Sequence, residues 1–470
     1  MKSTLLRLAL LVAAALALPA AAPAADLADI YHRALRNDPQ LREAEATRMA
    51  ALEARPQALA AVLPQLSGTA GYTHDQLDMS EPYVLSSGAT IPLGIGTKSD
   101  TTQWGVSLRQ TLFRWDQFAT LKTADAQVAQ AEIDFRAAQQ SLIIRTATAY
   151  FNVLAAHDTL EAAEASREAI SHQLEQAEKR FEVGLIAITD VEDAKAANDQ
   201  ATATVIGAKR TLATARDQLR ELTGDSADEL SRPGDDMPLV TPDPASEEQW
   251  VRAALDQNLP LISARLGADV ARENISVARA GHLPTLDLVA SRSGLNTTGT
   301  GLASYIDPQT GLQTFNYPPT TNNNDKQIAL QLTVPLYSGG YASSKVREAV
   351  YRHRAAREHL ETTARATERA TRDSYLGVIS EISQVQALKQ ALESSRTALA
   401  ATEAGYEVGT RTSVDVLTAR QRLLDAQTNY ARSRYDYVID VLTLEQAAGT
   451  LDESRVTRVN GWLGQIVSVK

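Results

Sequence analysis

The stretch RFEVGLIAITDV (residues 180–191) decides the fold, because a second version of it, GYEVGTRTSVDV, occupies residues 405–416. The same offset of 225 relates Tyr150 to Tyr375, and upstream Leu63-Pro64 returns as Leu283-Pro284 at an offset of 220. A repeat of this length predicts two copies of one structural unit. We place the copies at residues 25–224 and 251–449, with an acidic, Pro-rich connector at 225–250 between them and a C-terminal tail at 450–470.

Each copy is expected to hold a helix, two strands, a long helix and a return helix, which makes the chain mainly α with a β part. The first helical stretch, residues 26–60, should be interrupted at Pro39 and Pro56. The expected strands are residues 66–75, 102–113, 285–294 and 326–337, the long helices 116–182 and 340–407, and the return helices 189–223 and 413–448. The segments 94–99 and 297–324 are expected in external loops.

The expected strands alternate apolar with polar or small residues, most clearly at Ile328, Leu330 and Leu332. Alternation over about ten residues fits a strand that faces lipid on one side. A half-buried strand of a soluble sandwich has the same pattern, so the strands alone leave both readings open.

The long helix favours the membrane reading. Residues 116–182 contain no Pro and no Gly, and apolar residues recur every seven positions, with one jump of four. Three residues after them stand mostly alanines, which predicts a coiled-coil seam with closely approaching helices. Copy two continues the pattern at Val378, Val385, Leu392, Leu399 and Tyr406. At 1.5 Å per residue such a helix is a rod of roughly 100 Å, too long for the core of a compact domain.

The N-terminus and the composition narrow the location. Residues 1–24 combine Lys2 and Arg7 with an apolar stretch and a small-residue cleavage site, which predicts a secretory signal peptide. The chain has no cysteine, so disulfides and Cys-ligated metals are excluded, and a net charge of −11 argues against nucleic acid as a partner. We expect no enzymatic activity and no cofactor, because no nucleophile–base pair or metal-ligand cluster stands out.

Four strands per chain cannot close a barrel, and an open sheet edge is not tolerated in lipid. Several chains must therefore share one barrel: two would supply eight strands, three twelve and four sixteen. A periplasmic coiled-coil adaptor or structural protein without its own pore is the alternative. It is disfavoured because an adaptor lacks two symmetric strand pairs.

Four stretches resemble the TolC-type outer-membrane channels of the outer membrane factor family: TATAYFNVL (146–154), RFEVGLIAITDV (180–191), GHLPTLDL (281–288) and GYEVGTRTSVDVL (405–417). The resemblance covers nearly the whole chain after residue 24. It implies a homotrimer with a twelve-stranded barrel in the outer membrane of a Gram-negative bacterium, continuous with a twelve-helix periplasmic barrel. It also implies an exit duct for tripartite efflux and type I secretion, with a periplasmic adaptor and an inner-membrane pump or ABC secretion transporter as partners.

The candidate site lies at the two helix–turn–helix tips. Gly184 and Gly409 should end the long helices in a left-handed conformation, and Thr189 with Glu192, and Thr412 with Asp415, have the spacing of capping boxes. We expect the tips to contact the adaptor through Val183, Gly184, Leu185, Val408, Gly409 and Thr410.

The resemblance also implies a gate. Its latch would be Thr189, Asp190, Tyr406 and Arg411, and the pore constriction would be Asp415 and Thr418. Three Asp415 carboxylates around one axis would raise one another's pKa and attract cations. The family's usual second aspartate ring is replaced here by Thr418, which puts tight cation block in doubt. No other metal site is expected.

Overall fold

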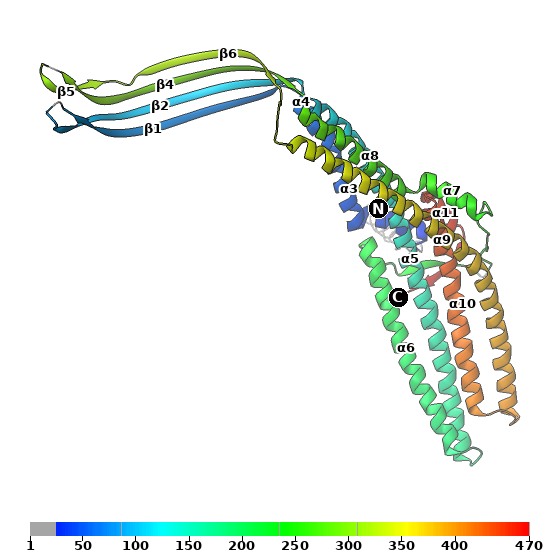
Figure 1. Cartoon of the computed structure of the whole chain (residues 1–470). Helices are drawn as coiled ribbons and strands as arrows, with labels where there is room; N and C mark the ends of the chain where they lie inside the picture. Colours follow the sequence, from blue (N-terminus) through cyan, green and yellow to red (C-terminus); the bar gives the residue numbers. More distant parts are fainter. Residues whose placement is uncertain (1–24, 86, 235, 308, 470) are drawn as a thin grey trace, which may run out of the picture. The chain divides into compact units, whose positions relative to one another are not determined.

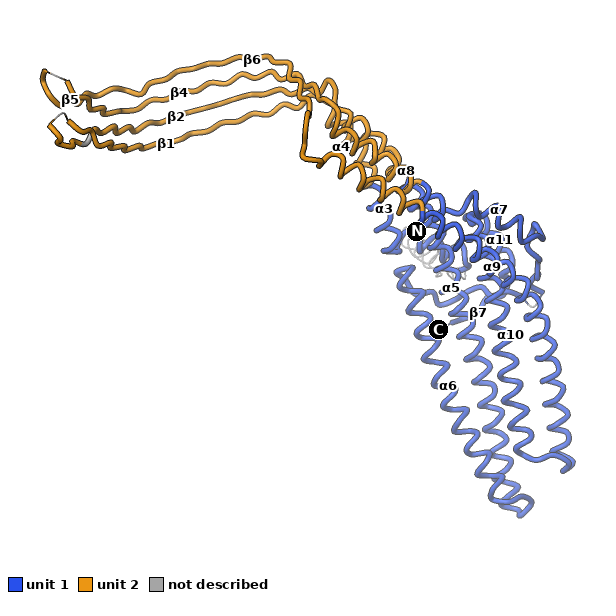
Figure 2. Tube along the Cα trace, viewed as in Figure 1, with its two compact units in different colours: residues 1–49, 130–265, 358–470 blue, residues 50–129, 266–357 orange. Residues whose placement is uncertain are grey.

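The computed structural model describes residues 25–85, 87–234, 236–307 and 309–469. The chain divides into two compact units (Figure 2): one contains residues 130–265, the segment before residue 50 and the segment after residue 357, and the other contains residues 50–129 and 266–357. The predicted signal peptide, residues 1–24, lies outside the described residues. Among the helices of the described part, none is long and apolar enough to cross a membrane.

Unit 1 is built on long helices. Helix α5 (Trp115–Glu182) turns into α6 (Ile188–Thr223), and α9 (Tyr341–Glu407) turns into α10 (Ser413–Ala447) (Figure 1). Much of the predicted seam in unit 1 is buried, with these residues at most 8% exposed: Leu142, Ala149, Val153, Ala156, Ala163, Ile170, Ala177, Val378, Val385, Leu392 and Leu399. Leu160 and Leu174 on the same seam are only partly buried, and Phe181 at its end is 41% exposed. Small alanines on this seam let neighbouring helices pack closely.

Aromatic side chains form the centre of unit 1. Phe151 and Tyr435 stack with ring centroids 5.7 Å apart, and Tyr150 packs edge-on against Phe151. The buried hydroxyls have partners: Tyr150 donates to the Ser231 carbonyl at 2.5 Å and Tyr435 to Asp158 at 2.6 Å. The buried aromatic residues of the described chain all belong to this unit: Tyr31, Tyr150, Phe151, Trp250, Tyr435 and Tyr437.

The connector and the C-terminal tail form one small sheet. Strand β3 (Glu229–Pro233) pairs antiparallel with β7 (Leu463–Ser468), and Ala25 bridges to Leu230, which is fully buried. Helices α7 (Glu247–Gln257) and α11 (Glu453–Asn460) belong to the same unit. The Pro-rich connector is therefore anchored, because it pairs with the C-terminal tail and with Ala25.

The shorter helices precede the strands in each copy. They are α2 (Leu27–Asn37), α3 (Pro39–Leu52) and α4 (Ala54–Val62) in copy one, and α8 (Leu259–Arg279) with the 3₁₀ turn η1 (Ala280–His282) in copy two. The first predicted break occurs at Asp38, next to Pro39. The second was misplaced: it lies at Glu53, and Pro56 sits in the first turn of α4, where a missing N–H is tolerated.

Unit 2 contains an antiparallel sheet of β1 (Gln65–Val84), β2 (Thr90–Phe113), β4 (Thr285–Asp307), β5 (Gly311–Tyr317) and β6 (Thr321–Thr333). The order is β1-β2-β4, and β6 and β5 follow each other along the same side of β4. Where β6 pairs with β4, the sheet therefore contains four strands side by side, two from each copy.

The strands differ in length from those predicted. Residues 94–99, expected in a loop, lie inside β2, and most of 297–324 belongs to β4, β5 and β6. These segments are rich in Gly, Thr and Asn, so they lack the alternation of apolar and polar residues by which the strands were predicted. They still form strands because their backbone N–H and C=O groups are hydrogen-bonded to the neighbouring strands. Strand β6 ends at Thr333 instead of 337, before Pro335, which cannot donate to a ladder.

Candidate functional site

The two predicted tips are sharp turns that end in glycine. Gly184 has φ 75° and Gly409 has φ 81°, so the predicted left-handed helix ends are confirmed. In copy one the N–H of Leu185 donates to the carbonyl of Arg180 at 2.9 Å, and that of Gly184 donates to Phe181 at 2.8 Å. Copy two has the same pair of bonds, which together are a Schellman motif.

The two return helices begin differently. Thr412 and Asp415 form a capping box, in which the Thr412 hydroxyl accepts from the Asp415 N–H and the Asp415 carboxylate accepts from the Thr412 N–H. The predicted box at Thr189 is wrong: α6 begins at Ile188, its N-cap is Ala187, and no side chain caps it. Because α6 begins at Ile188, one residue before the predicted start of the helix, Thr189 lies inside its first turn and cannot act as the cap.

Apolar side chains at the tips point into solvent in this chain. Val183 is 69% exposed, Leu185 73% and Val408 76%. Exposed aliphatic residues gathered on two turns suit a protein partner. The predicted adaptor contact at these residues remains a prediction.

The predicted latch residues belong to both hairpins. Thr189 and Asp190 lie in the first turn of α6, whereas Tyr406 is next to the last residue of α9 and Arg411 lies in the following turn. Among the described residues, no hydrogen bond or ion pair joins either member of the first pair to either member of the second. The latch through these four residues therefore stays a prediction.

Two other contacts join the hairpins in the part nearest the tips, and neither was predicted from the sequence. The Gln173 amide, in α5, donates to the Ser413 hydroxyl at 3.2 Å, and both residues are buried. The Arg180 guanidinium carbon lies 5.0 Å from the centroid of the Tyr406 ring. Gln173 and Arg180 are seven residues apart and so share one helix face. Their heptad spacing was visible in the sequence, but the seam was traced through apolar residues alone.

The predicted constriction residues lie on α10. Asp415 has a pKa below its ordinary value, because the Thr412 backbone N–H and then its hydroxyl donate to the carboxylate, with Arg411 adding attraction. Contacts within the single chain thus favour the charged form of Asp415. Repulsion among three Asp415 carboxylates in the predicted ring would act in the opposite direction and favour the neutral form. Thr418 is exposed and lines a cavity of about 240 Å³ between α5, α6 and α10.

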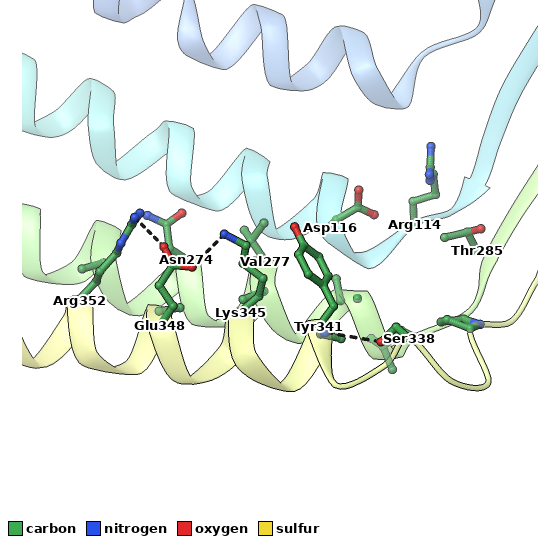
Figure 3. Close-up of a pocket in the computed structure, with 18 of the residues that line it drawn as sticks. Arg114, Asp116, Asn274, Val277, Thr285, Ser338, Tyr341, Lys345, Glu348 and Arg352 are labelled. Carbon is green, nitrogen blue, oxygen red and sulfur yellow. Dashed lines mark hydrogen bonds and ion pairs between the residues drawn. The ribbon is translucent and has the colours of Figure 1, made fainter.

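A larger groove, of about 860 Å³, lies in unit 2 beside the start of α9 (Figure 3). Thr285 and Thr333 line it and alternate with the apolar residues of their strands, so the groove opens on the polar side of the sheet. Glu348 pairs with Lys345 at 2.8 Å and with Arg352 at 2.6 Å. Both of these cations are thus already paired with the same carboxylate.

One group of possible metal ligands lies among the described residues: His157, Asp158 and Glu161. The Asp158 carboxylate already accepts from Arg232 at 3.3 Å and from Tyr435 at 2.6 Å. A guanidinium beside the carboxylate opposes cation binding, so this group is a structural network.

Comparisons with known proteins agree with this architecture. A family model described as "Outer membrane efflux protein" matches residues 30–225 and 250–450, that is, both copies. The chain is 39% identical to the outer membrane protein TolC of Vibrio cholerae, covering 97% of this chain and 98% of the relative. It is 29% identical to the alkaline protease secretion protein AprF of Pseudomonas aeruginosa, covering 91% and 85%. The Campylobacter jejuni CmeC outer membrane channel shares the fold, with a TM-score of 0.71, 18% identity and coverage of 92% and 89%.

Proposed function

The chain belongs to the outer membrane efflux protein family, and from that premise we propose that it is the outer-membrane exit duct of efflux pumps and of type I secretion. The likeness to TolC supports the location in the outer membrane, with an extension into the periplasm. The likeness to AprF, named for alkaline protease secretion, supports the secretion role.

One observation carries the proposal: the sheet of unit 2 has a row of exposed apolar side chains along its edge strand. On β6, Ile328 is 83% exposed, Leu330 64% and Leu332 63%. Their cross-strand partners are Ala290, Leu288 and Leu286. Among the described residues, β1 and β6 each pair on one side only. A sheet with an apolar face and two free edges requires other copies to close in lipid.

We infer that three copies close this barrel, because three sets of four strands give the twelve that the family resemblance implies. The long helices of the three copies would form the periplasmic barrel. Its entrance would be the helix tips, gated by Thr189, Asp190, Tyr406 and Arg411 and narrowed at Asp415 and Thr418. The exposed Val183, Leu185 and Val408, with Gly184, Gly409 and Thr410, would meet a periplasmic adaptor, which would join the duct to an inner-membrane pump or ABC secretion transporter.

Two matched substitutions on β6 test the membrane assignment. Leu330→Arg puts a charge on the apolar row, whereas Gln331→Arg puts the same charge on the opposite face. An arginine facing lipid costs about 2–4 kcal/mol near the middle of the bilayer. We therefore expect Leu330→Arg to lower the amount of oligomer in purified outer membranes, with Gln331→Arg at the parental level.

The same membrane fractions distinguish an outer-membrane channel from the alternative, a periplasmic adaptor without a pore. The parental protein should sediment with the outer membrane as a detergent-resistant oligomer and form pores in planar bilayers. Recovery as a water-soluble monomer from the periplasm would favour the pore-free adaptor instead. Equal behaviour of the two arginine variants would refute the lipid-facing row.

A further inference from the structure

Two cations lie at one end of the apolar row on β6. On the face that carries Ile328 and Leu330, the next residue of β6 is Lys326, and Arg292 lies directly opposite it on β4. Both side chains are exposed. Like charges that face each other across a strand pair repel and destabilise the sheet. The pair therefore requires an anion between the two cations to become favourable.

The described strands supply no such anion. Among the described residues, neither cation forms an ion pair or a hydrogen bond with another side chain. The acidic residues on this face of the described strands are Asp78 and Asp100. Asp100 is six residues along β2 from Val106, the partner of Arg292, which is roughly 20 Å. A further copy whose β1 closed the free edge of β6 would not help, because β1 has no acid on this face before Asp78.

A tryptophan lies beside the two cations. Trp104 of β2 is on the same face, and its ring centroid is 5.9 Å from the guanidinium carbon of Arg292. The ring lies across Gly294, because a Cβ there would be 2.8 Å from Cε2 of the indole. Indole rings gather at membrane–water interfaces, and the next residue of β6 on this face after Lys326 is the polar Asn324. The cations therefore lie at the boundary of the apolar row and not in its middle.

The boundary with the cations is the outer one. Strands β1 and β4 begin directly after α4 and η1, and the row starts at that end with Leu286 and Leu332. Arg292 and Lys326 lie at the other end of the row, toward the hairpin turns. Since the protein extends from the outer membrane into the periplasm, and the helices form that extension in the proposed duct, this end of the row meets the outer leaflet.

We propose that Arg292 and Lys326 bind the phosphate group of a lipid headgroup in the outer leaflet. A phosphate has enough acceptor oxygens to accept from a guanidinium and an ammonium group at the same time. It would replace the repulsion between the two cations with two charge-assisted contacts, and the Trp104 ring would lie against the same lipid. This inference rests on the lipid-facing row of the proposed function, to which it adds a binding site for phosphate-bearing lipid.

The test is the binding of lipid A, a phosphorylated glycolipid, to the full-length oligomer in mild detergent, measured by native mass spectrometry. Arg292→Gln and Lys326→Gln should each lower the affinity by about three- to tenfold, the loss of one charge-assisted contact at an exposed site. Arg109→Gln removes the same charge from the opposite face of the sheet and should bind as the parent does. Dephosphorylated lipid A with the same acyl chains should bind the parent more weakly, and free inorganic phosphate at the same concentration should not displace the lipid.

Thermal midpoints separate binding from a structural role. Without lipid A, Lys326→Gln should unfold at or above the parental midpoint, because the substitution removes the repulsion from Arg292. With lipid A, the midpoint of the parent should rise, and that of Lys326→Gln should rise clearly less. A side chain that only stabilises the sheet would instead lower the midpoint under both conditions when it is replaced.

The outcomes separate this proposal from the proposed function. A parental protein that forms no pore would overturn the exit duct itself. A pore-forming parent that binds lipid A and its dephosphorylated form equally well would refute the phosphate site, and this comparison needs no variant. A loss in Arg109→Gln as large as in the other two variants would refute it too. Displacement of the lipid by inorganic phosphate would show that the cations bind phosphate alone and would overturn the lipid assignment.

Discussion

The internal repeat provides its own control for the energetics of one buried carboxylate. Asp38 caps α3 by accepting from the Leu41 N–H at 2.9 Å, and its side chain is only 2% exposed. It also forms a two-pronged pair with Arg145, at 3.1 and 2.6 Å. In copy two, Asn258 occupies the same place and accepts from the Leu261 N–H at 3.0 Å. Among the described residues, no arginine side chain is hydrogen-bonded to it.

Removing the two caps should therefore have unequal effects. Asn258→Ala loses a cap and the hydrogen bond to the Ala447 carbonyl, a loss of about 1–2 kcal/mol. Asp38→Ala loses a cap and leaves Arg145 unpaired. Breaking a buried pair costs about 3–5 kcal/mol, but Arg145 is 27% exposed and solvent screens it, so we expect about 3 kcal/mol in all. Asp38→Asn keeps the cap and should fall between them.

The assay is denaturant unfolding of the detergent-solubilised protein, followed by circular dichroism at several pH values. Burial would raise the pKa of Asp38, but hydrogen bonds from Arg145 and the backbone outweigh burial and leave the pKa below its ordinary value. The pair's contribution is thus present above the pKa of a free carboxyl, about 4, and is lost as the pH falls through the lowered pKa. Equal losses for Asp38→Ala and Asn258→Ala at neutral pH would refute the reasoning.

Two further predictions concern α10 and its end. Burial raises the pKa of Glu445 to about 7, although Arg455 opposes the shift. The folded protein therefore keeps a proton on Glu445 that the unfolded chain releases near pH 4. The free energy of unfolding should fall as the pH rises between those two values. Glu445→Gln should remove most of that fall, by about 1–2 kcal/mol after screening, and unfolding midpoints that still separate between pH 5 and pH 8 would contradict this. Gly184→Ala should cost about 1 kcal/mol of stability, because only the positive φ of Gly184 would be strained. Gly449→Ala should lower the thermal midpoint clearly more, because a Cβ at Gly449 would also lie 2.2 Å from the Gln257 carbonyl oxygen. Equal shifts of the midpoint would show that the backbone at Gly449 moves to make room.

The duplication, the helix tips and much of the coiled-coil seam could be predicted from the sequence alone. These features are local or strictly periodic: Gly184 and Gly409 end helices because only glycine tolerates their φ values, and Val378 or Leu392 is buried because a heptad keeps one face of a helix toward its neighbours. The length of the strands was not determined, because their Gly- and Thr-rich ends lack an apolar pattern and are held by ladder hydrogen bonds to residues some 200 positions away.

The contacts between the two tips could not be predicted from the sequence. Arg180 and Tyr406 are more than 200 residues apart in the chain, and no spacing rule relates a position on α5 to one on α9 until the two helices pack. The same holds for Gln173 with Ser413 and for the strand that the connector forms with the tail. Periodicity says which face of a helix is buried. Which partner that face meets, and with which residues, depends on packing between distant segments.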